Sequence, residues 1–171
     1  PKAIYTLWTE AERNAIGIYT VDIDNSKKKN EEWYNNTNIT YAFSGGKVTG
    51  SYGDATAKPH ADILYTAQDE TDGLGTEGDV KVEGLKTILI RDVKTQAESE
   101  LNKTDWYVVR KSEEDTAIPS AVTTHRRAVR SKAAAMETSI TNASDTPALE
   151  TLYTSVDEDE RPIGYIPVKN F

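Results

Sequence analysis

Two runs of apolar residues at helical spacing constrain the fold of this chain more than any other feature. The first lies between about residues 79 and 101, where apolar side chains recur at steps of three and four. They are Leu85, Ile88, Leu89, Val93, Ala97 and Leu101. The second follows Pro119, spans about 120–141 and carries a narrower stripe of Val122, Val129, Ala133, Met136 and Ile140. Both patterns are typical of amphipathic helices, so we expect a two-helix C-terminal unit.

In the N-terminal part, apolar residues recur with a different period. Residues 18–24 alternate between apolar and polar side chains, which predicts a half-buried strand. Two further β-rich runs, 39–43 and 48–52, flank Gly45-Gly46 and predict a hairpin with a primed turn. We therefore expect a small antiparallel β-meander over residues 18–53. Ahead of it, Thr9 and Glu12 form a capping-box pattern for a short helix that Gly17 ends.

The predicted fold class is thus α+β, with the meander followed by the two helices. Residues 54–84 are less clear, and 59–65 fit either a strand or a short helix. The stretch 69–78 holds three glycines among acidic residues, which predicts an exposed loop and a boundary between a β-rich domain, 1–75, and a helical unit, 76–171. Near the end, 157–160 is an acidic run expected in a solvated loop, and 163–168 is expected to be extended.

Composition excludes several classes of site. The chain has no cysteine and two histidines, which rules out disulfides, thiol nucleophiles and multi-histidine metal centres. The formal net charge of −8 disfavours wholesale nucleic-acid binding. No apolar run approaches the ~18 residues of a transmembrane helix, and the first residues show no signal peptide. We expect no membrane insertion, no metal and no cofactor.

Several segments resemble catalytic or binding motifs but lack the residues or the spacing that those motifs require. The run 22–33 has Lys27 and Trp33 where a calcium loop needs Gly and Glu. The segment 44–48 lacks the spacer and hydroxyl residue of a phosphate loop. His60 and His125 adjoin no nucleophile motif. Asp105, beside Trp106, is the only carboxylate in an apolar setting, and it fits better as a turn cap. We therefore expect that the chain is not an enzyme.

One basic cluster lies on the second helix: His125, Arg126, Arg127, Arg130 and Lys132. Arg126 and Arg130 lie one helical turn apart, on one face, where guanidinium groups can bind carboxylates or phosphates. Three alternatives remain open. The cluster could pair internally with the acidic residues just upstream, Asp105, Glu113, Glu114 and Asp115. It could instead bind a protein partner or nucleic acid.

The segment 101–110, Leu-Asn-Lys-Thr-Asp-Trp-Tyr-Val-Val-Arg, lies between the two predicted helices, with His125-Arg126 and Arg130 downstream. This arrangement resembles tailed-bacteriophage tail proteins of the tail assembly chaperone or tail fibre assembly type. Segments 9–19 and 45–52 resemble the family more loosely. The chain departs from it at His125, where the family has Tyr, in the longer acidic loop 111–118, and in the tail 142–171.

The resemblance implies a bacteriophage virion structural protein of the tail, baseplate or fibre-attachment region, made in the host cytoplasm. Its expected partners are other phage structural proteins, with several copies of the chain in one assembly. Two alternatives are a transient assembly chaperone absent from the virion and a head-decoration protein. The residues implied in docking are Trp106, Tyr107, Arg110, Arg126 and Arg130. Aromatic residues and arginine are the usual composition of interface hot spots. If these residues dock, replacing Arg126 by Ala should spare the fold but weaken assembly. Trp106 could instead clamp the two helices together.

Overall fold

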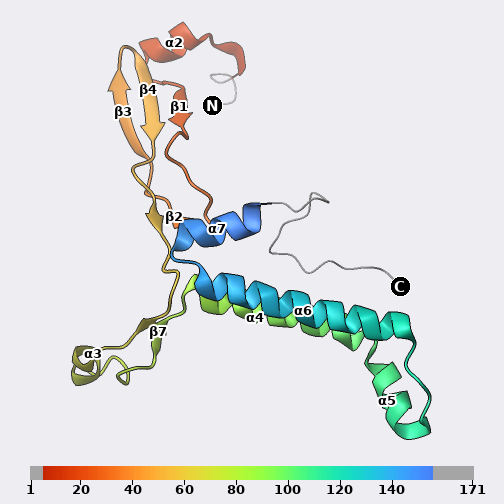
Figure 1. Cartoon of the computed structure of the whole chain (residues 1–171). Helices are drawn as coiled ribbons and strands as arrows, with labels where there is room; N and C mark the ends of the chain where they lie inside the picture. Colours follow the sequence, from red (N-terminus) through yellow and green to blue (C-terminus); the bar gives the residue numbers. More distant parts are fainter. Residues whose placement is uncertain (1–5, 156–171) are drawn as a thin grey trace. The chain divides into compact units, whose positions relative to one another are not determined.

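The computed structural model describes residues 6–155. The chain divides into two compact units, residues 1–57 and residues 58–171, which we describe separately (Figure 1). The fold is α+β, with small sheets in the first unit and several helices in the second. The boundary that the sequence suggested after residue 75 falls inside the second unit, between helix α3 (Ala67–Thr71) and strand β7 (Val80–Val82).

The first unit opens with the short helix α2 (Glu10–Ala15), and its capping box is confirmed. The Thr9 N–H donates to the Glu12 carboxylate at 2.7 Å, and the Glu12 N–H donates to the Thr9 hydroxyl at 3.3 Å. Gly17 follows the helix with φ of 81°. The Ile18 N–H bonds the Arg13 carbonyl at 2.9 Å, which is the contact that closes a helix through a left-handed glycine. The predicted start and end of this helix are both confirmed.

A three-stranded sheet follows, built from β1 (Val21–Asp24), β3 (Thr40–Ser44) and β4 (Lys47–Ser51) in the order β1-β4-β3. The β3–β4 hairpin is confirmed, and Gly45 and Gly46 adopt φ of 59° and 78°, as a primed turn requires. The all-antiparallel meander is wrong, because β1 pairs with β4 in parallel. A meander needs short turns between successive strands, whereas residues 25–39 form a long connection that places β4, rather than β3, beside β1.

The rest of the first unit is a small second sheet. Strand β2 (Tyr34–Asn35) pairs antiparallel with β5 (Thr56–Ala57). Trp33 and Tyr34 are the only hydrophobic side chains of this unit, within the described residues, that are buried. The unit therefore has a very small core for its length.

In the second unit, β6 (Ile63–Leu64) pairs antiparallel with β7, and α3 lies in the connection between them. The exposed loop predicted for 69–78 is therefore partly helical. The first long helix does not begin at residue 79 as predicted, because 80–82 form β7. It begins after Gly84, whose N–H donates to the Asp62 carboxylate at 2.7 Å. This bond, followed by one from the Thr87 hydroxyl, lowers the pKa of Asp62.

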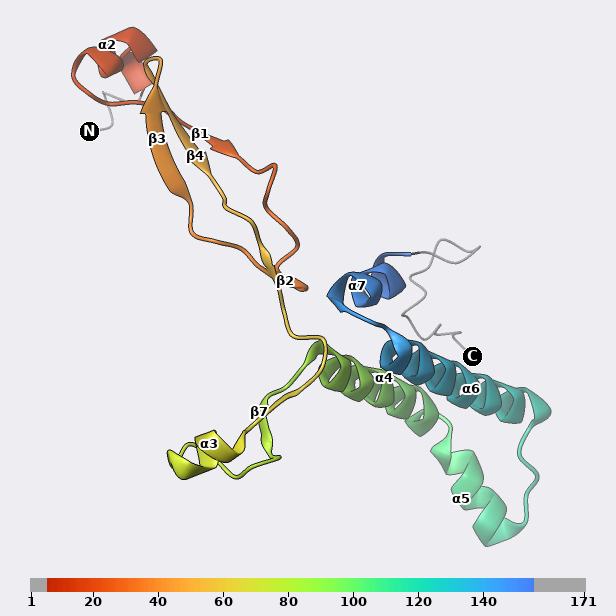
Figure 2. The same cartoon turned by 60° about the vertical axis from the view of Figure 1, so that its left-hand side comes forward.

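Helices α4 (Leu85–Asn102) and α6 (Ser120–Asn142) lie side by side and form the core of the second unit (Figures 1 and 2). All five apolar positions predicted for α6 are buried. With Arg126 they recur at alternating steps of four and three, which is the spacing of a coiled-coil seam. On α4 the buried apolar residues are Leu85, Leu89, Val93 and Ala97. Of the other two positions predicted for this stripe, Ile88 and Leu101, both are half-buried.

The second unit contains further helices besides the two long ones that the sequence predicts. Helix α5 (Asp105–Glu114) takes up the segment after α4 and the first part of the expected acidic loop 111–118. Helix α7 (Thr146–Thr154) packs against α6 through Leu149, which is fully buried. Its first residue, Thr146, donates its hydroxyl proton to the Lys58 carbonyl at 2.6 Å. The predicted acidic loop 157–160 and extended segment 163–168 lie outside the described residues.

Candidate docking surfaces

The Arg126 side chain lies at the junction of α4 and α5 and is 8% exposed. Its Nη1 atom lies 2.7 Å from the Leu101 carbonyl, 2.8 Å from the Thr104 hydroxyl and 2.7 Å from an Asp105 carboxylate oxygen. A guanidinium placed in this way offsets the charge of the Asp105 carboxylate and adds a hydrogen bond to the Leu101 carbonyl near the end of α4, which also accepts from Thr104. Arg126 therefore joins α4, α5 and α6 from within and is not available to a partner.

This geometry assigns a structural role to the first two residues of the Thr-Asp-Trp motif. Thr104 is buried, and its hydroxyl both donates to the Leu101 carbonyl at 3.0 Å and accepts from Arg126. Asp105 is the first residue of α5, not its cap, and it supplies the carboxylate for Arg126. Of the carboxylates considered for internal pairing, Asp105 contacts the basic cluster, whereas Asp115 pairs with Lys111 on its own helix at 2.5 Å.

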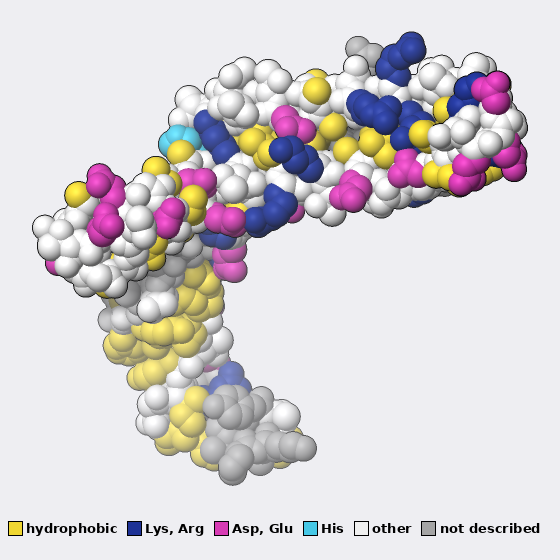
Figure 3. All heavy atoms as spheres, turned by 90° about the horizontal axis from the view of Figure 1, so that it is seen from below, with side chains coloured by type: hydrophobic (Ala, Val, Ile, Leu, Met, Phe, Trp, Pro, Cys, Tyr) yellow, Lys and Arg dark blue, Asp and Glu magenta, His cyan; other side chains and the backbone are white. Residues whose placement is uncertain are grey.

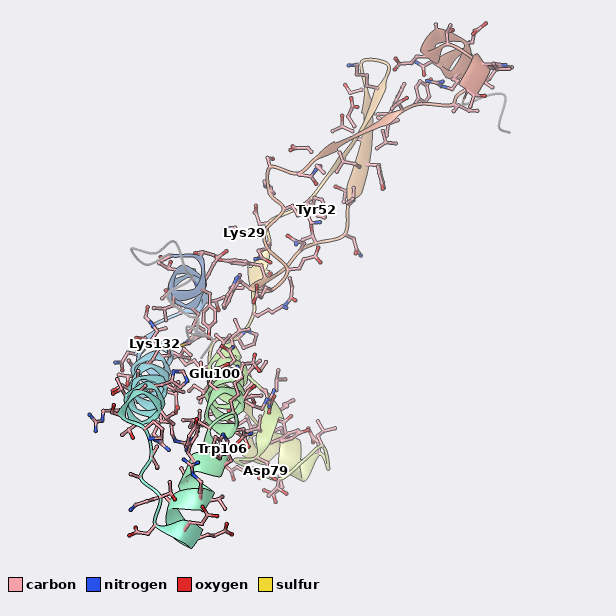
Figure 4. The ribbon with its side chains drawn as sticks, turned by 90° about the vertical axis from the view of Figure 1, so that its right-hand side faces the viewer. Lys29, Tyr52, Asp79, Glu100, Trp106 and Lys132 are labelled. Atoms are coloured by element: carbon pink, nitrogen blue, oxygen red, sulfur yellow. The ribbon has the colours of Figure 1, made fainter. Side chains whose placement is uncertain are left out.

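The third motif residue, Trp106, has a different environment. Its side chain is 51% exposed, and α5 contains no buried residue. In Figures 1, 2 and 4, α5 extends beyond the end of the α4–α6 pair instead of packing along it. Trp106 therefore does not clamp the two long helices together. Val108 and Val109 are also exposed, so α5 presents large apolar side chains to solvent.

Trp106, Tyr107 and Arg110 form a stacked cluster on α5. The two ring centroids lie 3.8 Å apart, and the Arg110 guanidinium carbon lies 4.8 Å from the Trp106 ring centre and 5.4 Å from that of Tyr107. Such cation–π contacts hold the three side chains in fixed relative positions. The buried Arg110 Nε atom has no hydrogen-bond partner within residues 6–155. Three of the five predicted docking residues are therefore adjacent on one helix.

Arg130, the fifth predicted residue, faces a separate groove along α6. This groove has a volume of about 600 Å³, and its lining includes the aliphatic residues Val108 and Ile118 and the cationic residues Arg126, Arg127 and Arg130. The hydroxyl residues Thr123 and Ser131 complete its polar lining. Within residues 6–155, no carboxylate forms an ion pair with Arg127 or Arg130. Their cationic groups are thus free to meet an anionic partner.

A second apolar surface lies on the three-stranded sheet, and the sequence analysis did not single it out. The register places Val21, Val48 and Phe43 in one row across the sheet, and Ile23, Gly50 and Tyr41 in the next. Directly paired residues point to the same face, so both rows share one side of the sheet. Tyr41 is 63% exposed and Phe43 is 59% exposed. Figure 3 shows hydrophobic side chains gathered over the first unit.

This face could have been found from the sequence. Alternation at Val21 and Ile23, and again at Tyr41 and Phe43, indicates one apolar face per strand. Only the register shows that the three strands contribute to one surface. The pattern also predicts burial of this face, whereas the described residues leave it open.

The two histidines, which the sequence assigned to no site, lie in different segments of the chain. His60 precedes β6, where its carbonyl accepts the Lys86 N–H at 3.0 Å, and His125 is half-buried on α6. Within residues 6–155, no group of His, Cys, Asp or Glu side chains is arranged to hold a metal ion. In the same residues no helix is both long enough and apolar enough to cross a membrane.

No family model matches the chain, and neither the curated proteins nor the solved structures contain a match to it.

Proposed function

We propose that this chain is a non-enzymatic bacteriophage structural protein of the tail, baseplate or fibre-attachment region, and that it acts by docking to neighbouring subunits in a multi-copy assembly. The observation that carries this proposal is the exposure of large apolar side chains on an ordered element of each unit. These are Tyr41 and Phe43 on the sheet and Trp106 and Val109 on α5. Contiguous exposed apolar surface marks interaction sites in proteins that function in water.

The sheet supports a role that depends on contact with other chains. A parallel strand pair is normally covered on both faces. The β1–β4 pair instead exposes Val21 and Ile23 on one face and aspartates on the other. An apolar partner surface on this face would supply the burial that the small core of the first unit lacks.

Helix α5 supports the same role because it is fixed at one end and exposes apolar side chains. Arg126 and Thr104 fix its first turn, so the helix is held at one end while its apolar side chains remain open. Trp106 is a large residue with two side-chain torsions, and ordering it in an interface costs little conformational entropy. The Thr-Asp-Trp resemblance to tail proteins supplies the biological context of the proposal.

The test is to replace Trp106 and Val109 together by Ala in the phage that encodes the chain. Because Trp106 is half exposed, Trp106→Ala alone should lower the free energy of unfolding by only about 1 kcal/mol. The double variant should remain folded by circular dichroism, yet its incorporation into purified virions, measured by quantitative mass spectrometry, should fall at least tenfold.

The matched control is Lys111→Ala on the same helix, which removes an exposed ion pair with Asp115 and should leave incorporation unchanged. Normal incorporation of the double variant would contradict the assignment of α5 as a docking element. If the wild-type chain is absent from virions but needed for their assembly, the alternative role as a transient assembly chaperone is correct. Imaging of labelled protein at the head rather than the tail would favour head decoration.

A further inference from the structure

We propose that the arginine groove on α6, defined by Arg127, Arg130, Val108 and Ile118, is the docking site for the acidic segment 156–163 of the same chain. The groove shares Val108 with α5, but its lining does not include Trp106, Val109 or the sheet residues on which the proposed function rests. The inference therefore stands or falls independently of the proposed function.

Charge is the first argument for this occupant. Arg127 and Arg130 project from one side of α6 without a carboxylate partner within residues 6–155. They do so in a chain whose formal net charge is −8, where acidic residues are in excess. The longest uninterrupted run of those acidic residues is Asp157-Glu158-Asp159-Glu160. Carboxylates bind guanidinium groups with short, charge-assisted hydrogen bonds.

The apolar part of the groove fits the same segment. Val108 and Ile118 line the same groove as the arginines. In the sequence, Val156 immediately precedes the acidic run and Ile163 follows it closely. A peptide with carboxylates in the middle and an aliphatic side chain towards each end matches a groove with both kinds of lining. A nucleic acid phosphate would satisfy the arginines but not the aliphatic wall.

The position of α7 places the segment within reach. Leu152 and Tyr153 line a pocket against Lys132 and Met136 of α6, so the chain leaves α7 beside the middle of α6 (Lys132 is labelled in Figure 4). Arg130 precedes Lys132 by two residues on α6. The two positions are therefore separated by only about 3 Å along the helix axis but by about 200° around it. The acidic segment must therefore cross to the other side of α6.

That crossing is short enough. The residues between Tyr153 and Glu160 can span up to about 25 Å when extended, and an α-helix with its side chains is about 10–12 Å across. The outer surface of α6 between the two sites carries the small, exposed residues Ala128, Ser131 and Ala135. Small side chains leave room for a crossing peptide, so the segment can reach both arginines without disturbing α7.

The consequence is a groove that the protein covers with its own chain. Such an intramolecular contact competes with any external acidic peptide, because the tethered segment is present at a high effective concentration. The contact should also weaken as salt is added, since Arg127 and Arg130 are exposed.

The experiment uses the full chain in two forms, wild type and a neutralised form with Asp157→Asn, Glu158→Gln, Asp159→Asn and Glu160→Gln. A fluorescent synthetic peptide of residues 155–163 is titrated against each, and binding is read by fluorescence anisotropy. The neutralised chain should bind the peptide at least ten times more tightly than wild type, because its own segment no longer occupies the groove. A peptide carrying the same four neutral substitutions should not bind.

Two further variants of the neutralised chain locate the site. Arg127→Gln with Arg130→Gln should abolish peptide binding, and both arginines are exposed, so the fold should be retained by circular dichroism. Lys132→Gln, which removes a cation from the opposite side of α6, should leave the affinity unchanged.

Three results would overturn the proposal. These are equal peptide affinity of the wild-type and neutralised chains, absence of binding to both, and binding that survives loss of the two arginines. Light scattering separates the same-chain contact from an exchange between two copies. If the wild-type chain is a dimer that becomes monomeric on neutralisation, the segment docks on a second copy and the intramolecular assignment is wrong.

Discussion

Arg126 shows how one side chain can change role between sequence and structure. Its place in the basic cluster made it a candidate for partner binding, but it is buried and bound to the Leu101 carbonyl, Thr104 and Asp105. Internal pairing was one of the alternatives that the residue pattern left open. The structure adds the helix-end carbonyl, which no sequence pattern indicates. The predicted docking residues that remain for an external partner are Trp106, Tyr107 and Arg110 on α5, whereas we assign Arg130 to the groove for the acidic segment of the same chain.

The substitution Arg126→Met tests this internal role. It keeps the aliphatic bulk of the side chain but removes its hydrogen bonds, leaving the buried Thr104 hydroxyl without its donor. We expect the free energy of unfolding to fall by roughly 2–3 kcal/mol, the range for a partly buried charged hydrogen-bond group. Urea denaturation followed by helical circular dichroism measures this change.

The control is Arg130→Met, which is exposed and should change the free energy of unfolding by no more than about 0.5 kcal/mol. Equal effects of the two substitutions would show that Arg126 does not hold the α4–α5 junction.

Gly84 tests a second feature at the scale of a single residue. A Cβ atom at this position would overlap the Ala61 backbone and lie 2.7 Å from the Asp62 nitrogen. Because backbone atoms cannot rotate away, Gly84→Ala should lower the free energy of unfolding of the helical unit by about 3 kcal/mol, at the upper end of overpacking costs. Chemical denaturation is the measurement.

Gly50→Ala is the matched glycine control. Its Cβ would lie 2.8 Å from Ile23 Cδ1 and 2.9 Å from Tyr41 Cε1, which are the ends of side chains that can move. A smaller cost is expected than at Gly84. If Gly50→Ala lowered the free energy of unfolding more than Gly84→Ala, α4 would not start against the backbone of residues 61–62.

At the scale of elements, one carboxylate links α3 to β7 within the paired β6–α3–β7 segment. Asp69 accepts hydrogen bonds from the Thr66 N–H at 2.9 Å and hydroxyl at 2.8 Å, which completes the capping box of α3. It also pairs with Lys81 of β7 at 2.6 Å. The Lys81 hydrogen bond, followed by those from Thr66, lowers the pKa of Asp69 from 3.8 to about 2.

This lowered pKa predicts a pH dependence of the segment. A carboxylate whose pKa is lower in the folded state stabilises that state fully above its unfolded value, here 3.8, and the contribution is lost as the pH falls through about 2. Amide hydrogen exchange of residues 63–82 should therefore show more opening at pH 2 than at pH 5, compared after correction for intrinsic rates. In Asp69→Asn, the difference between the two pH values should largely disappear. A segment equally protected in both proteins at both pH values would argue against this role of Asp69.

At the scale of the whole molecule, the two units differ in how they bury apolar surface. The helical unit has a continuous seam between α4 and α6, whereas the sheet unit buries Trp33 and Tyr34 and leaves its apolar face open within the described residues. Stability from burial scales with the area removed from water. The sheet unit is therefore the part expected to gain most from contact with another subunit.

Tyr41→Thr with Phe43→Thr tests this expectation in the full chain. Both rings are mostly exposed, and Thr is well suited to strands, so the free energy of unfolding should change by less than about 1 kcal/mol. Fluorescence of a bound hydrophobic dye should fall clearly, because the apolar face is removed. As a control, Thr40→Ser with Ala42→Ser on the opposite face should leave dye binding unchanged. Unaltered dye fluorescence in the first variant would show that this face is not the exposed apolar surface.

Most of the secondary structure could be predicted from local patterns. The stripe on α6, the capping box at Thr9 and the Gly45-Gly46 turn each depend on residues close in sequence, and all three are confirmed. The extra helix α5 was missed because Trp106-Tyr107-Val108-Val109 is aromatic and β-branched, which favours strands in isolation. The parallel β1–β4 pairing was missed because neither strand carries a signal for its neighbour or direction.

The sequence by itself determined which faces of this protein are apolar, since periods of two and of three to four residues assign each side chain to a side of its strand or helix. Tertiary structure alone decided which of those faces are covered. The α4 and α6 stripes meet each other, while the sheet face and α5 remain open in the described residues. It also decided that Arg126 turns inward and Arg130 outward. The physical reason is that burial depends on contacts between residues far apart in sequence, which a local period does not encode.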